Sequence, residues 1–91
     1  MPCSLTRSDV SSLVLEVIRK RENDPNISEG TRFWEDLRID AKARRGYFRP
    51  IKTKVEAAGC TLSKVSPQNF EEAKDVKKIV DLVWADVKVD E

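Results

Sequence analysis

The sequence contains no histidine among its 91 residues. Histidine is the commonest general base, the usual activator of a nucleophilic serine or cysteine, and a frequent zinc ligand, so its absence removes those sites. Only three glycines are present, and Gly30, Gly46 and Gly59 are too far apart to form a phosphate-binding loop. Because so little of a catalytic pattern remains, we expect a protein that is not an enzyme and holds neither a cofactor nor a metal.

Long hydrophobic runs are also missing, and none approaches the length of a membrane span. The N-terminus MPCSLTRSDV lacks the apolar core of a signal peptide, so we expect a cytoplasmic protein without a membrane partner. The two cysteines, Cys3 and Cys60, form no CxxC pair and allow one disulfide at most. Cys3 lies in a predicted tail and Cys60 follows a predicted helix, so we expect two free thiols.

Charge and apolar periodicity are what the sequence does have. Charged residues make up 36% and hydrophobic residues 40% of the chain, which is typical of a soluble globular protein and not of a disordered tail. A chain of this length forms one domain with a modest core. We therefore expect a single domain over residues 1–91, with frayed ends near residues 1–4 and 89–91.

The first helix is predicted to begin near Thr6, whose side chain can accept from the amide of Asp9 in a capping box. The residues that follow have the spacing of one apolar helical stripe: Val10, Leu13, Val14, Val17 and Ile18. Asp24-Pro25-Asn26 prevents the helix from continuing, so residues 23–32 form a long loop. Ile27 is expected to reach the core from this loop.

The second helix is interrupted by Pro50, which has no amide to donate. Either the helix begins near Phe48 with Pro50 in its first turn, or it begins near Ala41 and is kinked between Gly46 and Pro50. The good helix formers at residues 41–45 favour the kinked or two-piece form. Residues 60–65 are expected to form an extended connection.

Two more helices complete the prediction. Ser66 followed by Pro67 predicts a short helix that buries Phe70, and Asp75 is expected to cap a last helix with an apolar stripe. The fold class is therefore all-α, a small bundle of three main helices plus one short helix with a long first loop. The predicted core consists of Val14, Ile18, Phe33, Leu37, Ile51, Val55, Val80 and Val83.

The stretch Phe33-x-x-Asp36-Leu37-x-Ile39-Asp40 resembles the motif F-x-x-D-L-G-x-D-S-L of the acyl and peptidyl carrier proteins. In that family the serine after the aspartate carries 4′-phosphopantetheine, and the matching position here is Ala41, which has no hydroxyl. Arg38 stands at the family's glycine and Lys42 at its second leucine. The resemblance implies a carrier-protein-like bundle, a degenerate member without the attachment serine. In a different helical bundle, the same apolar residues would fill the core and Asp40 would cap the second helix.

Positive charge is concentrated in one segment. Residues 38–54 contain seven basic residues and one acidic residue, a net charge of +6, whereas the whole chain carries only +1. A run of charge can be a solvated helix face, but this segregation also creates a positive field that selects acidic partners. The candidate partner-binding residues are Arg38, Lys42, Arg44, Arg45, Tyr47, Arg49 and Lys52.

Three functions are compatible with these residues. The first is a non-catalytic protein-interaction module that docks an acidic protein through the basic second helix. The second is nucleic-acid binding, with the same basic residues on phosphates and Tyr47 or Phe48 as a stacking group; the low total charge and an acidic last helix argue against it. The third is a small inhibitor or immunity-type bundle, for which no residue signature is present. The sequence indicates neither the partner's identity nor the oligomeric state.

Overall fold

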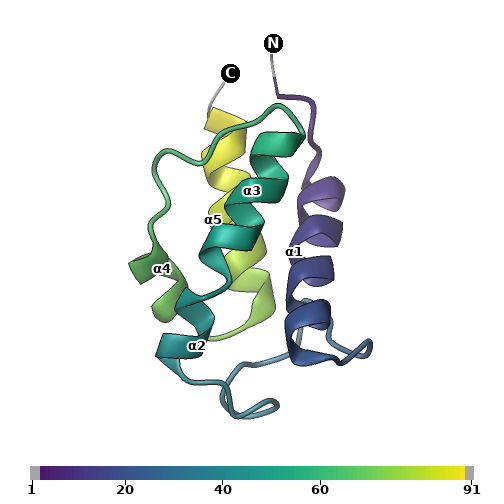
Figure 1. The fold of residues 1–91 in the computed structure, drawn as a ribbon, viewed down its shortest axis with the longest axis vertical. Coiled ribbons are helices and arrows are strands. Elements are labelled where there is room, and N and C mark those ends of the chain that lie inside the picture. Colours follow the sequence, from purple (N-terminus) through teal and green to yellow (C-terminus); the bar gives the residue numbers. More distant parts are fainter. Residues whose placement is uncertain (1–2, 90–91) are drawn as a thin grey trace.

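The computed structural model describes residues 3–89, which contain five α-helices and no β-strand. The helices are α1 (Arg7–Glu22), α2 (Ala41–Arg45), α3 (Phe48–Ala57), α4 (Pro67–Glu71) and α5 (Val76–Val89). Helix α1 packs against both α3 and α5, while the short helices α2 and α4 pack against each other beside them (Figure 1). The all-α prediction is confirmed, and no helix in the described residues is long and apolar enough to cross a membrane.

Helix α1 begins at the predicted capping box. The Thr6 hydroxyl accepts from the Asp9 amide at 3.1 Å, and the Asp9 carboxylate accepts from the Thr6 amide at 3.0 Å. These bonds satisfy backbone donors that the first turn leaves without partners. The helix ends at Glu22 and is capped by Asn23, whose left-handed backbone (φ 54°) turns the chain into the loop.

The predicted second helix forms two pieces, α2 and α3, and thereby combines the two alternatives. The Asp40 carboxylate accepts from the Ala43 amide at 2.9 Å and starts α2. Pro50 lies in the first turn of α3, where its missing amide leaves no bond unmade. At the junction, a Cβ on Gly46 would lie 3.2 Å from the Ala43 carbonyl oxygen and 3.3 Å from the Arg21 guanidinium, so a larger residue would make these neighbours shift.

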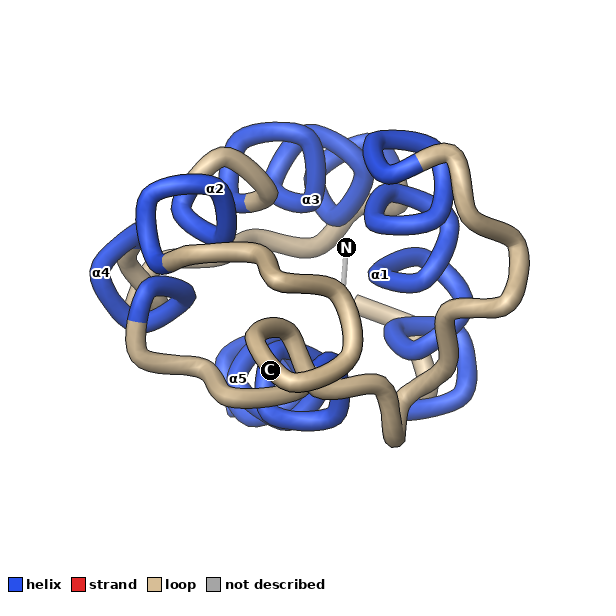
Figure 2. The backbone as a smooth tube through the Cα atoms, turned by 90° about the horizontal axis from the view of Figure 1, so that it is seen from below, coloured by secondary structure: helices blue, strands red, loops and turns tan. Residues whose placement is uncertain are grey.

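The long loop between α1 and α2 runs across one end of the bundle (Figure 2). It is fixed there by backbone hydrogen bonds to the segment that joins α4 to α5. The Phe33 amide donates to the Lys74 carbonyl at 3.0 Å, and the Val76 amide donates to the Thr31 carbonyl at 3.1 Å. These bonds use backbone groups that a continuous helix would bond within itself. Helices α4 and α5 are therefore separate, although Ala73 is buried between them.

The core agrees with the predicted residues except at one position. Seven of the eight are buried, and Leu37 is only half-buried at the edge of the core. Ile27 reaches the core from the loop as predicted, and Phe70 is buried from α4. Tyr47 was expected at the surface, but its side chain is fully buried and belongs to the core.

The prediction of two free thiols is wrong, because Cys3 and Cys60 form a disulfide. Their Cα atoms are 4.8 Å apart, since the segment before α1 passes the end of α3 (Figure 1). Of the ends predicted to be frayed, Cys3 is tied to the bundle by the disulfide, and Val89 is the last residue of α5. Residues 1–2 and 90–91 lie outside the described residues. Disulfides are typical of oxidising compartments. This bond therefore does not favour a cytoplasmic location, which stays a prediction.

Candidate functional site

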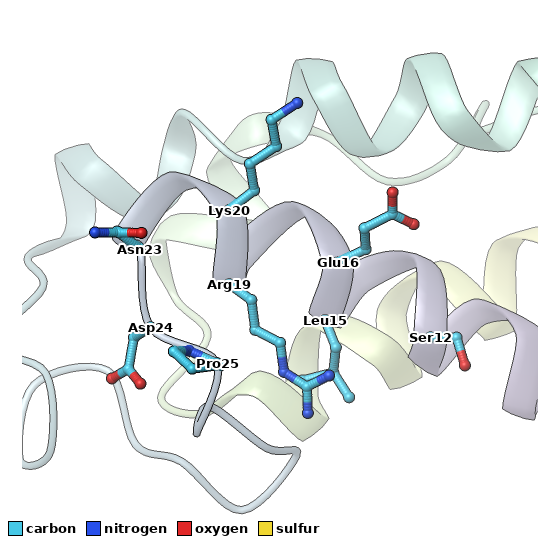
Figure 3. A pocket seen from close by; sticks show the side chains of 8 residues that line it. All are labelled: Ser12, Leu15, Glu16, Arg19, Lys20, Asn23, Asp24 and Pro25. Carbon is cyan, nitrogen blue, oxygen red and sulfur yellow. The ribbon is translucent and has the colours of Figure 1, made fainter.

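One depression lies along α1 and the start of the loop that follows it, and has a volume of about 570 Å³. It is lined by Ser12, Leu15, Glu16, Arg19, Lys20, Asn23, Asp24 and Pro25. Figure 3 shows that Glu16 and Lys20 extend to one side of the helix while Leu15 and Arg19 extend to the other. Arg19 already donates to the Ile27 carbonyl at 2.8 Å. Because its polar groups do not converge, this depression is not a candidate site.

Tyr47, one of the seven predicted site residues, lies in the core. Its hydroxyl donates to the Glu22 carboxylate at 2.7 Å, and its ring centroid is 5.9 Å from that of Phe33. Burial, and secondarily the bond to Glu22, raises the pKa of the Tyr47 phenol above its usual value. A stacking role for Tyr47 does not fit this position. Tyr47, Ile51 and Val55 are spaced four residues apart, as on one face of a helix. Because Ile51 and Val55 are apolar, this spacing is the sequence signal that indicates the burial of Tyr47.

Arg44 is a second predicted site residue that the fold uses internally. Its guanidinium donates to the Ile39 carbonyl at 2.9 Å and to the Glu71 carbonyl, and it lies 5.7 Å from the Phe33 ring centroid. These contacts join the long loop, α2 and α4. Arg44 therefore stabilises the packing of the bundle. The local sequence does not distinguish this role from that of its neighbour Arg45.

Arg38 lies in the long loop, separate from the helices. Its backbone is left-handed (φ 56°), a conformation that favours glycine and that other residues adopt at a cost. Its guanidinium stacks 5.3 Å from the ring centroid of Trp34, the large hydrophobic side chain that is 52% exposed. The two side chains form an exposed cation–π pair.

Three of the four remaining basic residues, Arg45, Arg49 and Lys52, line a hollow between α2, α3 and the start of α4. Its volume is about 350 Å³, at the lower end of the range of ligand pockets, roughly 300–1,000 Å³. The basic hollow, as we call it, is lined by Arg45, Gly46, Phe48, Arg49, Lys52 and Pro67. Phe48 and Pro67 supply apolar surface, and the three cations surround it.

The cations of the basic hollow have few partners in the protein. Within residues 3–89, neither Arg49 nor Lys52 makes an ion pair, and Lys42 on the exposed side of α2 makes none either. Arg45 is 63% exposed, and its guanidinium is 3.9 Å from the Glu71 carboxylate, at the outer limit of an ion pair. The hollow therefore carries positive charge that the fold leaves largely uncompensated.

The aromatic ring that lines the hollow is held in place by its neighbours. The half-buried ring of Phe48 packs in a T-shape against Phe70, with the centroids 5.6 Å apart. The Lys52 ammonium lies 5.9 Å from the Phe48 ring centroid. Sequence reasoning did not connect Pro67 or Glu71 with this surface, because only the packing of α4 against α2 brings them there.

The acidic residues of α5 and its cap are largely used within the fold. Asp75 accepts from the Lys78 amide at 2.9 Å and caps α5, and Asp81 pairs with Arg7 at 2.8 Å. Asp86 is buried and accepts from the amides of Lys64 and Val65, both at 2.9 Å. Asp86 is therefore not part of an exposed acidic surface on the last helix, whereas the Asp81 side chain stays about half-exposed.

Ala41 is the first residue of α2, directly after the capping residue Asp40. The described residues contain no group of three or more side chains suited to hold a metal ion. Comparison of the chain with protein-family models, with curated proteins and with solved structures finds no match.

Proposed function

We propose that this chain is a non-catalytic, carrier-like protein-interaction module that docks an acidic partner protein through α2 and α3. The observation that carries the proposal is the set of cations around the basic hollow. Arg49 and Lys52 have no ion-pair partner in residues 3–89, yet they border the apolar surface of Phe48. Docking surfaces combine complementary charge at the rim with an apolar or aromatic centre.

The carrier-like part of the proposal is supported by the backbone around Ala41. In the carrier motif, glycine stands at the position of Arg38, and here that residue has the left-handed conformation that glycine adopts most readily. Asp40 caps the helix that begins at Ala41, where the motif has its attachment serine. Since alanine has no hydroxyl, incubation with a phosphopantetheinyl transferase and coenzyme A should leave the intact mass unchanged; a mass gain would contradict the proposal.

An acidic protein is favoured over nucleic acid by the same contacts. Tyr47 is buried, so Phe48 is the remaining stacking group of the two predicted, and its ring already contacts Phe70 and Lys52. Arg44 is engaged by backbone carbonyls and is not free to contact phosphates. A groove that follows a polyanion needs several cations in a row with stacking platforms, whereas three cations around one ring suit a compact protein contact.

The experiment is affinity capture from the native lysate with a charge-reversed pair, Arg49→Glu with Lys52→Glu. The matched control, Lys74→Glu with Lys78→Glu, makes the same charge change at exposed positions away from the hollow. We expect the first variant to lose the partner and the control to keep it. Both should change the free energy of unfolding by less than about 0.5 kcal/mol, as is usual for surface substitutions.

The dependence of binding on salt distinguishes the two partner classes. A nucleic acid held by four or five phosphate contacts should lose roughly a hundredfold or more in affinity between 50 and 200 mM salt. A protein with an apolar centre to its contact should lose less. Retention of the partner by the Arg49/Lys52 variant, or equal loss in the control, would contradict the proposal.

A further inference from the structure

We propose that the basic hollow is a socket for a single apolar side chain of an acidic peptide segment, with the carboxylates on either side of that side chain bound by the surrounding cations. This inference rests on the proposed docking function and specifies the chemistry of the partner. It also assigns a role to Glu71, whose carboxylate pairs with the Arg45 guanidinium when no partner is bound.

The apolar groups that line the hollow favour an inserted apolar side chain. Phe48 contributes a ring that Phe70 holds in a fixed orientation, and Pro67 contributes a second rigid apolar surface at the start of α4. Neither group can make hydrogen bonds through its side chain. An aliphatic side chain from a partner could therefore contact both apolar groups, and its burial would add to affinity in proportion to the area removed from water.

The charges around the socket favour carboxylates on both sides of the inserted residue. Arg49 and Lys52 lie on α3 and have no ion-pair partner in the described part of the chain, while Arg45 approaches from α2. An apolar peptide would leave these cations without new partners. An acidic peptide would neutralise them, and a guanidinium can bind a carboxylate through two parallel hydrogen bonds.

Glu71 acts as an internal competitor in this arrangement. Its carboxylate is 3.9 Å from the Arg45 guanidinium, a long contact between partly exposed groups that an incoming carboxylate can replace. The backbone carbonyl of Glu71 is bound separately by Arg44. Replacement of the side chain in Glu71→Gln therefore leaves the joint between α2 and α4 intact and releases Arg45.

The test is a nuclear magnetic resonance titration of the nitrogen-15-labelled protein with capped pentapeptides at up to millimolar concentration. The probe is Glu-Glu-Leu-Glu-Glu, and the controls replace the central leucine by alanine or the four glutamates by glutamine. An oligothymidylate is titrated in parallel. We expect the leucine peptide to bind about tenfold to fiftyfold more tightly than the alanine peptide, because leucine has three more carbon atoms that can be buried. The shifts should centre on the amides of Arg45, Phe48 and Arg49, and Glu71→Gln should tighten binding.

Each other result contradicts a specific part of the argument. Equal binding of the leucine and alanine peptides at these amides would refute the socket and leave the acidic docking function standing. Equal binding of the glutamine peptide would refute the role of the carboxylates. Absence of binding by every acidic peptide, or tighter binding by the oligothymidylate, would refute the socket together with the proposed function. Unchanged affinity in Glu71→Gln would refute internal competition.

Discussion

Arg7 at the start of α1 and Arg49 on α3 are both surface arginines, but within residues 3–89 only Arg7 of the two makes an ion pair. Its guanidinium donates to Glu29 in the long loop at 3.0 Å and to Asp81 on α5 at 2.8 Å. The Ser11 hydroxyl donates to the same Glu29 carboxylate. These bonds raise the pKa of Arg7, and the bonds from Arg7 and Ser11 hold the pKa of Glu29 below its usual value. The Arg49 guanidinium makes no ion pair with any carboxylate in the described part of the chain.

The difference teaches how to separate charges that organise this fold from charges that are available to a partner. An arginine that joins three elements is already bound, so a second protein would have to break existing contacts to use it. An arginine beside an apolar hollow keeps its full capacity for a complementary carboxylate. Arg44 and Arg45, which are adjacent in sequence, divide in the same way.

The largest expected effect concerns the constraint that closes the bundle, far from the basic hollow. Cys3→Ser removes a disulfide between residues separated by 57 positions, which in the chain-entropy model should lower the free energy of unfolding by about 4 kcal/mol. Denaturant unfolding without reductant measures this loss, and reduced wild-type protein should match the variant. Detection of two thiols in the denatured, unreduced wild-type protein would contradict the pairing.

Arg44→Ala and Arg45→Ala should differ although the two residues are neighbours. Loss of the Arg44 bonds to two backbone carbonyls leaves partly buried acceptors unsatisfied, so the free energy of unfolding should fall by about 1–3 kcal/mol. Arg45→Ala removes a long, exposed ion pair and should change it by less than about 0.5 kcal/mol. Thermal or denaturant unfolding measures both. Equal stabilities would mean that Arg44 is only a surface charge.

Substitutions of Arg38 test how its backbone conformation contributes to the free energy of unfolding, and the expected effect is smaller. Arg38→Gly relieves the left-handed strain and Arg38→Ala does not, while both remove the contact with Trp34. The glycine variant should therefore be more stable than the alanine variant by about 1 kcal/mol. Parallel denaturant unfolding of the two variants measures the difference, and a more stable alanine variant would contradict the assigned backbone conformation.

The smallest effect is the dependence of stability on pH. The pKa of Glu29 in the folded protein lies below its ordinary value of 4.5, chiefly because of the bond from Arg7. A lowered folded-state pKa gives stability that is present above the unfolded-state pKa and is lost as the pH falls through the folded-state value. Glu29→Gln should flatten the decline of the melting temperature below pH 4.5, and Arg49→Gln should leave the shape of this decline unchanged. An identical acid profile in Glu29→Gln and wild type would contradict the linkage.

Signals confined to a few residues predicted much of this fold. The capping box at Thr6, the break before Pro50 and the turn chemistry after Glu22 each act within one helical turn, and the structure has the predicted element at each. The apolar stripes of α1 and α5 identified most of the core. Contacts between distant segments could not be predicted in this way. The disulfide and the bonds of Arg44 to the loop and α4 depend on how the helices pack.

The candidate site was predictable as a charged segment but not as a surface. The sequence indicated seven residues, of which Tyr47 is buried and Arg44 is bound internally. Arg45, Arg49 and Lys52 come together only because α2 and α3 meet at Gly46, and α4 completes the hollow with Pro67. Net charge along the chain shows where cations are concentrated, whereas their availability depends on which carboxylates and carbonyls the fold places beside them.

Amide hydrogen exchange of the protein with and without its captured partner tests the central claim most directly, because it maps the docking surface on the intact chain. The account predicts that binding slows exchange in residues 45–52 and 67–71, around the basic hollow. Exchange near Arg7 and Glu29, where the charges are paired within the fold, should not change. Slower exchange confined to the outer side of α1 or to α5, with residues 45–52 unaffected, would contradict the claim that the unpaired cations form the docking surface.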